Sequence, residues 1–285
     1  MEGVKLSLLN AFVNAALRED VKGGDHTSLA CIDPEAIDTA KLIVKDSGVI
    51  AGIEFAEYVF RKLDPECIFE PFIKDGDTVE HGDIAFKVTS YSQALLKGER
   101  LVLNTMQRLS GVATMSRKFS ELVQDLDVTI LDTRKTTPLL RFLEKWAVRV
   151  GGCTNYRDGL YDWIMIKDNH NDASGGIKQA IDKVKQYLKK NNMNLNITVE
   201  VRNMDELNEV LEAGGITRIM LDNFTLVKLR EGVKIIDKKF ESEASGGVNL
   251  STVRAIAETG VDFISVGALT HSAGSLDMSL KIVKE

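Results

Sequence analysis

The second half of this 285-residue chain alternates strand-like and helix-like patterns in a regular order. Short apolar runs predict strands, and segments with helical periodicity predict helices between them. Because βα repetition places consecutive strands side by side in one direction, the pattern predicts a parallel sheet, either doubly wound or closed into a barrel. The predicted strands are residues 128–132, 163–167, 197–201, 218–222, 239–244 and 263–267, and the predicted helices are residues 138–149, 176–190, 204–213, 225–236 and 250–258.

Polar or small residues at the carboxyl end of every predicted strand distinguish between the two architectures. In β/α barrels the active site is built from these ends, with several strands contributing at once. A full barrel has eight strands in about 250 residues, whereas this pattern predicts six. We therefore expect an incomplete parallel β/α barrel with fewer than eight strands. The strand-end residues are Asp132, Arg134, Lys167, Glu200, Asp222, Ser245, Gly246, Gly247, Gly267 and Ala268.

The first part of the chain mixes helices and strands without strict alternation. Helical periodicity and strand-like runs together predict an α+β arrangement here. We expect an N-terminal domain over residues 1–112 and the barrel domain over residues 113–285, with the last residues packing back on the N-terminal domain. The predicted helices are residues 6–17, 54–63 and 93–123, and the predicted strands are residues 39–45 and 68–73.

Charge is unevenly distributed along the chain. The net charge is −6, but the segment from Arg134 to Lys167 holds seven lysines and arginines against three acidic residues. A basic site in an acidic protein indicates a small polyanionic substrate and argues against nucleic acid. No apolar run reaches the roughly 18 residues of a membrane-spanning helix. The cysteines at positions 31, 67 and 153 have no metal or disulfide spacing, which predicts a reducing, cytoplasmic compartment.

Three of the cations are candidates for binding the carboxylates of a substrate. The planar guanidinium groups of Arg134 and Arg157 match a carboxylate in bidentate geometry, and Lys167 adds a mobile point charge. A surface salt bridge is the alternative for any one of them. Lys167 is also a candidate for Schiff-base catalysis, but the adjacent Asp168 and an anionic ligand both favour its charged form. We favour charge pairing for this lysine.

Two carboxylates each close an apolar strand, Glu200 after residues 197–199 and Asp222 after residues 219–221. Oxygen ligands of this kind suit Mg²⁺, which is commonly shared with the phosphates of a substrate. The alternative is that each carboxylate forms an ion pair with a neighbouring cation. The residue pattern leaves both alternatives open.

Small residues at the last two strand ends predict a phosphate-binding loop. The Ser245–Gly247 turn allows backbone N–H groups to approach an anion, and the N-terminus of a following helix adds a favourable dipole. Gly267 and Ala268 have the same character at the last strand, where barrels commonly bind phosphate. His170 and His271 are candidates for acid–base groups, although as single histidines we interpret them as structural.

These residues lie within motifs by which the chain resembles the quinolinate phosphoribosyltransferase family over nearly its whole length. Glu19–Asp20 with the Gly24–Asp25 and Thr27–Ser28 pairs, the GERLVLN run at 98–104 and the SGVAT run at 110–114 carry the resemblance in the first half. The second half adds DTRKTTP at 132–138, NYRDGLYD at 155–162, IKDNH at 166–170, VEV at 199–201, IMLDN at 219–223, ASGGV at 244–248 and TGVDFISVGALTHS at 259–272.

The resemblance implies a phosphoribosyl transfer from phosphoribosyl pyrophosphate, with Mg²⁺, to quinolinate, a pyridine dicarboxylate. The products would be nicotinate mononucleotide, CO₂ and pyrophosphate, in de novo NAD synthesis. It also implies a homodimer or a higher even homo-oligomer with shared active sites. The expected fold is an N-terminal α/β domain followed by a barrel with fewer than eight strands.

The resemblance further assigns roles to individual residues. Quinolinate would be bound by Arg134, Tyr156, Arg157 and Lys167, helped by Lys135 and by Arg100 from the neighbouring subunit. Glu200 and Asp222 would hold the ribose hydroxyls and the Mg²⁺–pyrophosphate. The 5′-phosphate would be bound by Ser245, Gly246, Gly247, Gly267 and Ala268. Lys135, Lys167, Glu200 and Asp222 are the expected catalytic residues.

Four positions depart from the pattern of the family. Tyr156 stands where a histidine is usual, and a phenol donates one hydrogen bond but does not become cationic near neutral pH. Our hypothesis is that Tyr156 keeps a hydrogen bond that orients the substrate. Leu139 and Cys153 each replace a glycine, and Arg202 replaces an acidic residue.

Rival functions remain at this stage. A nicotinate phosphoribosyltransferase-like enzyme would act on a monocarboxylate and would need fewer cations. The molybdenum-transport-associated relative of the family should lack parts of the IKDNH and LDN motifs, which are both intact here. An aldolase-type barrel would use Lys167 as a Schiff base. A non-catalytic binding module would not need complete sets of cations, carboxylates and phosphate-binding residues.

Overall fold

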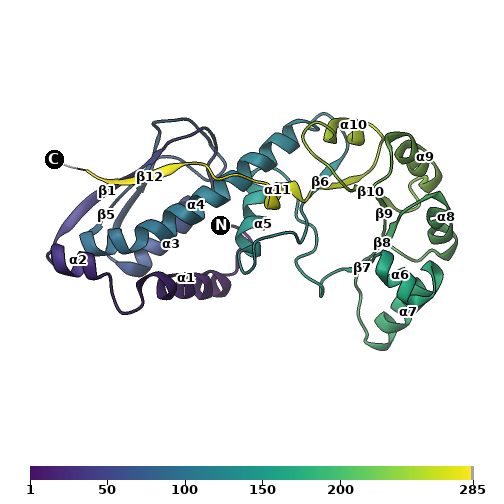
Figure 1. The fold of residues 1–285 in the computed structure, drawn as a ribbon, viewed down its shortest axis with the longest axis horizontal. Coiled ribbons are helices and arrows are strands. Elements are labelled where there is room, and N and C mark those ends of the chain that lie inside the picture. The colour runs from purple at the N-terminus through teal and green to yellow at the C-terminus, as the bar shows by residue number, and fades with distance from the viewer. Residues whose placement is uncertain (284–285) are drawn as a thin grey trace. The chain divides into compact units, whose positions relative to one another are not determined.

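The computed structural model describes residues 1–283, which belong to two compact units that interleave along the sequence (Figure 1). The N-terminal unit contains residues 1–117, residues 137–152 and the segment that begins at Ser272. The β/α unit contains residues 118–136 and 153–271. The expected domain boundary between residues 112 and 113 stays a prediction.

A four-stranded antiparallel sheet in the order β12–β1–β5–β3 forms the centre of the N-terminal unit. The last strand, β12, pairs with β1 from Ala40 opposite Ile282 to Val44 opposite Met278. One helix, α3, lies against the sheet, where the rings of Phe60 and Phe69 both contact Phe86. The strands are β1 (Ile37–Val44), β3 (Ile68–Pro71), β5 (Ile84–Tyr91) and β12 (Met278–Ile282), and β2 (Gly48–Val49) pairs separately with β4 (Thr78–Val79).

The helices of this part of the chain agree with the periodicity of the sequence. Those predicted at 6–17, 54–63 and 93–123 are confirmed, as are the strands at 39–45 and 68–73, whereas β5, β12 and α2 were not predicted. The helices are α1 (Leu6–Val21), α2 (His26–Cys31), α3 (Ile53–Leu63), α4 (Ser92–Glu121) and α5 (Arg141–Val150).

The β/α unit contains a six-stranded parallel sheet in the order β6–β11–β10–β9–β8–β7. Each strand leads into a helix, and α7, α8 and α9 cover the outer face of the sheet (Figure 1). The sheet is not closed, since β6 and β7 are its two edges among the described residues. This confirms the incomplete barrel with fewer than eight strands. The strands are β6 (Thr129–Leu131), β7 (Ile164–Ile166), β8 (Ile197–Val201), β9 (Arg218–Asp222), β10 (Glu241–Ser245) and β11 (Phe263–Ser265).

The helices of the β/α unit show one departure from the sequence prediction. The helix α6 (Asp168–Ser174) follows β7 directly and was not predicted. The helix expected over 250–258 is confirmed in a shorter form as α10 (Val253–Ala257). The others are α7 (Ile177–Lys190), α8 (Met204–Ala213), α9 (Leu226–Ile236) and α11 (Ala268–His271).

The basic segment from Arg134 to Lys167 is divided between the two units. Residues 137–152 belong to the N-terminal unit. Their cations lie on helix α5, where Arg149 donates to the carbonyl of Glu2 and Lys145 is buried. A basic site from this segment stays a prediction, and Arg134, Arg157 and Lys167 all belong to the β/α unit. Within residues 1–283, no helix has both the length and the apolar character that crossing a bilayer requires.

Candidate active site

The register of the parallel sheet places the predicted site residues of neighbouring strands at one edge. Ile166 is paired with Val199, so Lys167 and Glu200 follow side by side at the ends of β7 and β8. Further along the sheet, Asp222 at the end of β9 is paired with Ser245 at the end of β10. The carboxyl ends of these four strands therefore present a lysine, two carboxylates and the start of the glycine loop together.

Lys167 and Glu200 form a close ion pair. The Lys167 ammonium lies 2.6 Å from Glu200 Oε2, with side-chain exposures of 43% for the lysine and 8% for the glutamate. The pairing matches the ion-pair alternative for Glu200 and leaves the lysine accessible to an anion. The backbone N–H of Lys167 donates to His170 Nδ1 at 3.0 Å, which caps the start of α6. His170 is thus a structural group here.

Arg157 and Arg134 lie close enough for their charges to repel. The pKa of Arg157 is lowered, first by its burial and second by the positive charge of Arg134. Its Nη1 atom donates to the carbonyl of Trp163 at 3.3 Å, which holds the side chain beside the residue that precedes β7. Two neighbouring guanidinium groups, partly removed from water, form a favourable site for a carboxylate.

The loop that carries Arg157 is anchored by a buried carboxylate, Asp132. The Asp132 oxygens accept from Asn155 Nδ2 at 2.7 Å and from the backbone N–H of Tyr156 at 2.8 Å. Asp132 follows β6 directly and is fully buried. The same carboxylate therefore joins the end of β6, two residues before Arg134, to the segment that ends in Arg157.

The Tyr156 side chain is directed at the interior face of the sheet. Its hydroxyl lies 2.6 Å from Thr198 Oγ1 and is also hydrogen-bonded to Glu243. The ring packs edge-on against Trp163, with 5.4 Å between ring centroids. Burial, followed by the charge of Glu243, raises the pKa of the phenol. Direct contact of Tyr156 with a substrate stays a prediction, and in this structure its hydroxyl has partners within the protein.

The glycine loop after β10 has a backbone that side chains disfavour. Gly246 and Gly247 have φ values of 99° and 60°, in the left-handed region that only glycine adopts readily. A Cβ atom on Gly246 would overlap the side chain of Asn223, whose backbone N–H donates to the carbonyl of Ser245 at 2.8 Å. The loop is therefore built from bare backbone, as an anion site of N–H groups requires.

The last strand end brings a second small residue next to a cation. A Cβ atom on Gly267 would lie 2.9 Å from His271 Nε2 and 3.1 Å from Lys135 Cδ. The hydroxyl of Thr270 donates to the carbonyl of Lys135 at 2.8 Å. Lys135, Gly267 and His271 therefore form one cluster, in which Ala268 begins helix α11.

Asp222 and Glu200 are the two carboxylates that a hard cation would use at these strand ends. Asp222 Oδ2 accepts from Asn223 Nδ2 at 2.6 Å, and Glu200 is held by Lys167. Among residues 1–283 there is no group of three or more His, Cys, Asp or Glu side chains suited to a metal. Two carboxylate groups facing a phosphate site fit Mg²⁺ that is completed by substrate oxygens and water.

Arg100 lies apart from these residues in the chain, on helix α4 of the N-terminal unit. Its side chain is exposed, and its nearest acidic partner is the adjacent Glu99 at 3.3 Å. A shared site that uses this arginine from another subunit stays a prediction.

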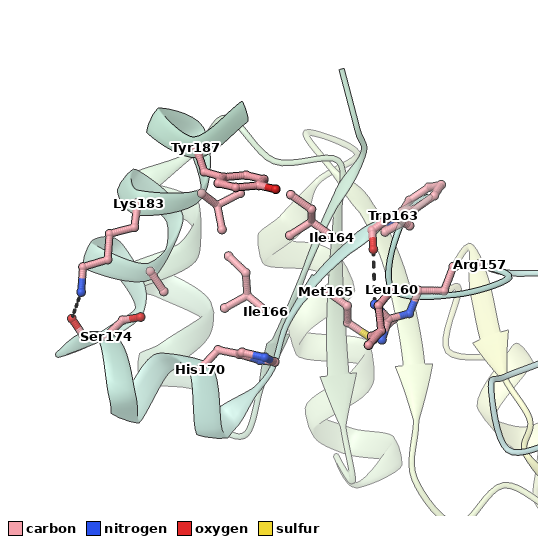
Figure 2. A pocket seen from close by; sticks show the side chains of 12 residues that line it. Arg157, Leu160, Trp163, Ile164, Met165, Ile166, His170, Ser174, Lys183 and Tyr187 are labelled. Atoms are coloured by element: carbon pink, nitrogen blue, oxygen red, sulfur yellow. Dashed lines mark hydrogen bonds between the residues drawn. The ribbon is translucent and has the colours of Figure 1, made fainter. Parts of the chain in front are cut away.

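A separate pocket of about 410 Å³ lies between β7 and the helices α6 and α7 (Figure 2). Ile164 and Ile166 contribute apolar side chains, and Tyr187 and Lys183 close it from α7. Neither the two carboxylates nor the glycine loop line this pocket. It shares only Arg157 and the neighbourhood of His170 with the strand-end residues, so it is not the predicted substrate site.

Sequence reasoning missed a buried polar network on the interior face of the sheet. Its members are Thr198, Arg218, Glu243 and Ser265, which lie within the strands and not in the loops that follow them. The available signal was the alternation of acidic residues in β10, where Glu241 and Glu243 share a face with Ser245. The sequence prediction considered only strand ends and passed over this face.

Cations, carboxylates and a bare glycine loop at the ends of parallel strands define an enzyme that binds small phosphorylated and carboxylated molecules. Residues 25–110 match the family model of the quinolinate phosphoribosyl transferase N-terminal domain, and residues 112–281 match that of its C-terminal domain. The chain belongs to the quinolinate phosphoribosyltransferase family.

Individual relatives agree with this assignment. The chain is 43% identical to quinolinate phosphoribosyltransferase [decarboxylating] 1b of Nicotiana tabacum, over 97% of this chain and 83% of that protein. It is 41% identical to the probable nicotinate-nucleotide pyrophosphorylase [carboxylating] of Bacillus subtilis, over 96% and 93% of the two chains. The crystal structure of NadC from Streptococcus pyogenes superposes with a TM-score of 0.92 at 36% identity, covering 100% of both chains.

Proposed function

We propose that this protein transfers the phosphoribosyl group of phosphoribosyl pyrophosphate to quinolinate with decarboxylation. The products are nicotinate mononucleotide, CO₂ and pyrophosphate, and the reaction belongs to de novo NAD synthesis. Family membership over both domains supports this activity. The observation that carries it is that the charge of Arg134 acts on Arg157 within the unit whose strand β7 is followed by Lys167, because a dicarboxylate requires several cations.

The cations account for the recognition of quinolinate. Its two adjacent carboxylates pair with Arg134 and Arg157, and Lys167 turns from Glu200 to the substrate. A lysine with a 43% exposed side chain makes this change at low cost, since its present bond to Glu200 is partly exposed to water. Lys135, next to Gly267, adds positive charge beside the phosphate loop.

Carboxylates and backbone account for the other substrate. The N–H groups of Ser245, Gly246 and Gly247, with those of Gly267 and Ala268, bind the 5′-phosphate. Glu200 and Asp222 accept hydrogen bonds from the ribose hydroxyls and hold Mg²⁺. When it is bound, the metal ion offsets the charge of the pyrophosphate leaving group.

Catalysis is then largely a matter of position and electrostatics. The site holds the pyridine nitrogen of quinolinate in line with the anomeric carbon, so that the new C–N bond forms as the C–O bond to pyrophosphate breaks. Loss of CO₂ from the neighbouring ring carbon leaves its electron pair on the ring, and that carbon then takes up a proton. Arg134, Arg157 and Lys167 stabilise the negative charge throughout.

We also propose that the active protein is a homodimer or a higher even oligomer, in which Arg100 reaches the quinolinate site of the neighbouring subunit. The exposed position of Arg100 on α4 supports this role. A cytoplasmic location is proposed from the free cysteines at positions 31, 67 and 153. Fractionation of the source cells tests the location directly.

The activity is tested by incubating the purified protein with quinolinate, phosphoribosyl pyrophosphate and Mg²⁺, and by following nicotinate mononucleotide and CO₂. A parallel reaction contains nicotinate in place of quinolinate. We expect both products from quinolinate and none from nicotinate. Turnover of nicotinate, or of neither compound, would refute the proposed substrate, and trapping of Lys167 by borohydride with an added aldehyde would support a Schiff-base enzyme instead.

A further inference from the structure

Below the strand-end residues, the sheet interior contains an acidic side chain that no substrate role explains. Glu243, in the middle of β10, is fully buried. Its carboxylate accepts hydrogen bonds from the hydroxyl of Ser265, from the hydroxyl of Tyr156 and from Nη1 of Arg218 at 3.3 Å. Burial raises the pKa of Glu243, and the three donors around its carboxylate oppose that rise and favour the ionised form, which has only acceptors.

Arg218 donates a hydrogen bond to Glu243, and its own side chain is buried. Its guanidinium is 5% exposed and lies 3.6 Å from the centroid of the Phe263 ring and 5.0 Å from that of Tyr156. It also donates to Glu241 at 2.8 Å. The guanidinium of Arg218 is thereby surrounded by two carboxylates and by the rings of Tyr156, Trp163 and Phe263, so it supports Glu243 and is not a site for a ligand.

The hydrogen bonds around Tyr156 have a fixed direction. The indole N–H of Trp163 can only donate, and it lies 2.8 Å from Thr198 Oγ1. The ionised carboxylate of Glu243 can only accept, so the single proton of Tyr156 goes to Glu243. Tyr156 therefore accepts the proton of Thr198, whose oxygen lies 2.6 Å away. The order from Trp163 to Glu243 leaves each hydroxyl with one acceptor and one donor role, which holds the Tyr156 ring in a single orientation.

This orientation reaches the substrate site through the next residue. Arg157 follows Tyr156 directly, and the backbone N–H of Tyr156 is held by Asp132. The negative charge of Glu243 also favours the charged form of Arg157, opposing burial and the repulsion from Arg134. Glu243 thus acts on Arg157 in two ways, by fixing the preceding side chain and by supplying a buried countercharge.

The geometry points to Glu243 as a positioning residue that, through Tyr156, holds Arg157 in place for a carboxylate of quinolinate. This inference rests on the proposed function. It assigns Tyr156 a role inside the protein in place of the substrate contact that the sequence predicted, and it names an acidic residue as a determinant of binding for an acidic substrate.

The test compares Glu243→Gln with the wild-type enzyme in the steady state. Glutamine keeps the shape of the side chain but removes the charge and places an amide N–H₂ group among three donors. We expect the KM for quinolinate to rise about tenfold, the loss that one charge-assisted hydrogen bond produces. The KM for phosphoribosyl pyrophosphate should stay within about twofold, since the bonds of Glu243 go to Ser265, Tyr156 and Arg218 and not to the glycine loop that follows β10. Tyr156→Phe should raise the quinolinate KM in the same direction, and the double variant should be no worse than Glu243→Gln, because both act along one path.

Glu241→Gln is the matched control. Glu241 bonds to the same arginine at 2.8 Å but is 42% exposed and is not bonded to Tyr156. Its substitution should leave both KM values unchanged. Thermal unfolding of all variants separates binding from folding, and calorimetric titration with quinolinate measures affinity without turnover. If Glu243→Gln fails to fold, Tyr156→Phe alone decides the matter by the same titration.

The outcomes are distinct. A wild-type enzyme without turnover of quinolinate refutes the proposed function and this inference with it. An active wild type whose quinolinate affinity is unchanged in Glu243→Gln, or in Tyr156→Phe where only that variant folds, refutes the positioning role alone. Equal rises in both KM values, or the same rise in Glu241→Gln, would likewise show a general disturbance of the sheet and overturn the inference.

Discussion

Leu139 has an unfavourable backbone conformation that a single substitution should relieve. Its φ is 64°, in the left-handed region, and its side chain is 89% exposed. Hydrogen bonds on both sides of Leu139 fix the turn in which it lies. The hydroxyl of Thr137 donates to Glu144 at 2.7 Å, and the N–H of Leu140 donates to the carbonyl of Thr137 at 3.1 Å. The backbone at position 139 therefore keeps its left-handed conformation whatever side chain it carries.

The magnitude follows from two opposing effects. A residue with a Cβ atom pays about 1–2 kcal/mol in the left-handed region, and glycine loses about 0.5–1 kcal/mol more backbone entropy on folding. Because Leu139 is so exposed, its removal forfeits little apolar burial. Leu139→Gly should therefore raise the free energy of unfolding by about 0.5–1 kcal/mol, or the unfolding midpoint by about 1–3 °C for a chain of this size.

Chemical and thermal unfolding, followed by circular dichroism, test this estimate against two controls. Leu139→Ala keeps the Cβ atom and should have nearly the stability of the wild type. Leu160→Gly removes another exposed leucine, 73% accessible, whose φ is not positive. It should lose about 0.5–1 kcal/mol. If Leu139→Gly is less stable than Leu139→Ala, backbone strain at this turn is not the controlling effect.

Three more predictions concern the site and its surroundings. Gly246→Ala should raise the KM for phosphoribosyl pyrophosphate by about tenfold or more. The φ of 99° and the overlap of the new Cβ atom with Asn223 force the loop to move, which costs about 1–3 kcal/mol. An unchanged KM in steady-state assays would exclude this loop from phosphate binding. Mixing Arg100→Ala and Lys167→Ala subunits should restore about a quarter of the wild-type activity after random exchange. Half of the dimers are then mixed, and one of the two sites in each mixed dimer has both wild-type residues. No recovery of activity after verified exchange contradicts a shared site. Burial raises the pKa of the Cys153 thiol to about 12, whereas the thiol of an unfolded chain has a pKa near about 8.5. The contribution of this thiol to stability is therefore complete below about pH 8.5 and is lost as the pH rises toward 12. Urea unfolding of Cys153→Ala should show a weaker fall in stability over that pH range, and a fall identical to that of the wild type contradicts the assignment.

Much of the fold was predictable because the buried strands of a parallel sheet appear in the sequence as short apolar runs. All six strands of the β/α unit were located from that pattern, and their carboxyl ends met at one edge because parallel register requires it. Strand β12 was not predicted, since its partner β1 lies at the other end of the chain and the pairing depends on tertiary contacts.

The sequence predicted which residues belong to the site, but it did not predict which residues bond to one another there. Lys167 and Glu200 follow apolar strands and were both proposed, but their choice of each other is visible only in the structure. Tyr156 was correctly noted as unusual, yet its partners, Thr198 and Glu243, lie on strands far along the sequence. One-dimensional periodicity separates buried from exposed positions and does not mark a polar residue that faces the interior of an open barrel.

The pairing of β12 with β1 has a consequence for the order in which the protein is made. On the ribosome, residues 118–136 and 153–271 emerge before the strand Met278–Ile282, so the β/α unit is available to fold while the N-terminal sheet still lacks its outer strand. During that interval β1 presents an unpaired edge of alternating apolar residues, a template for association between nascent chains. Stalled translation or a frameshift late in the message would therefore damage the first unit synthesised rather than the last.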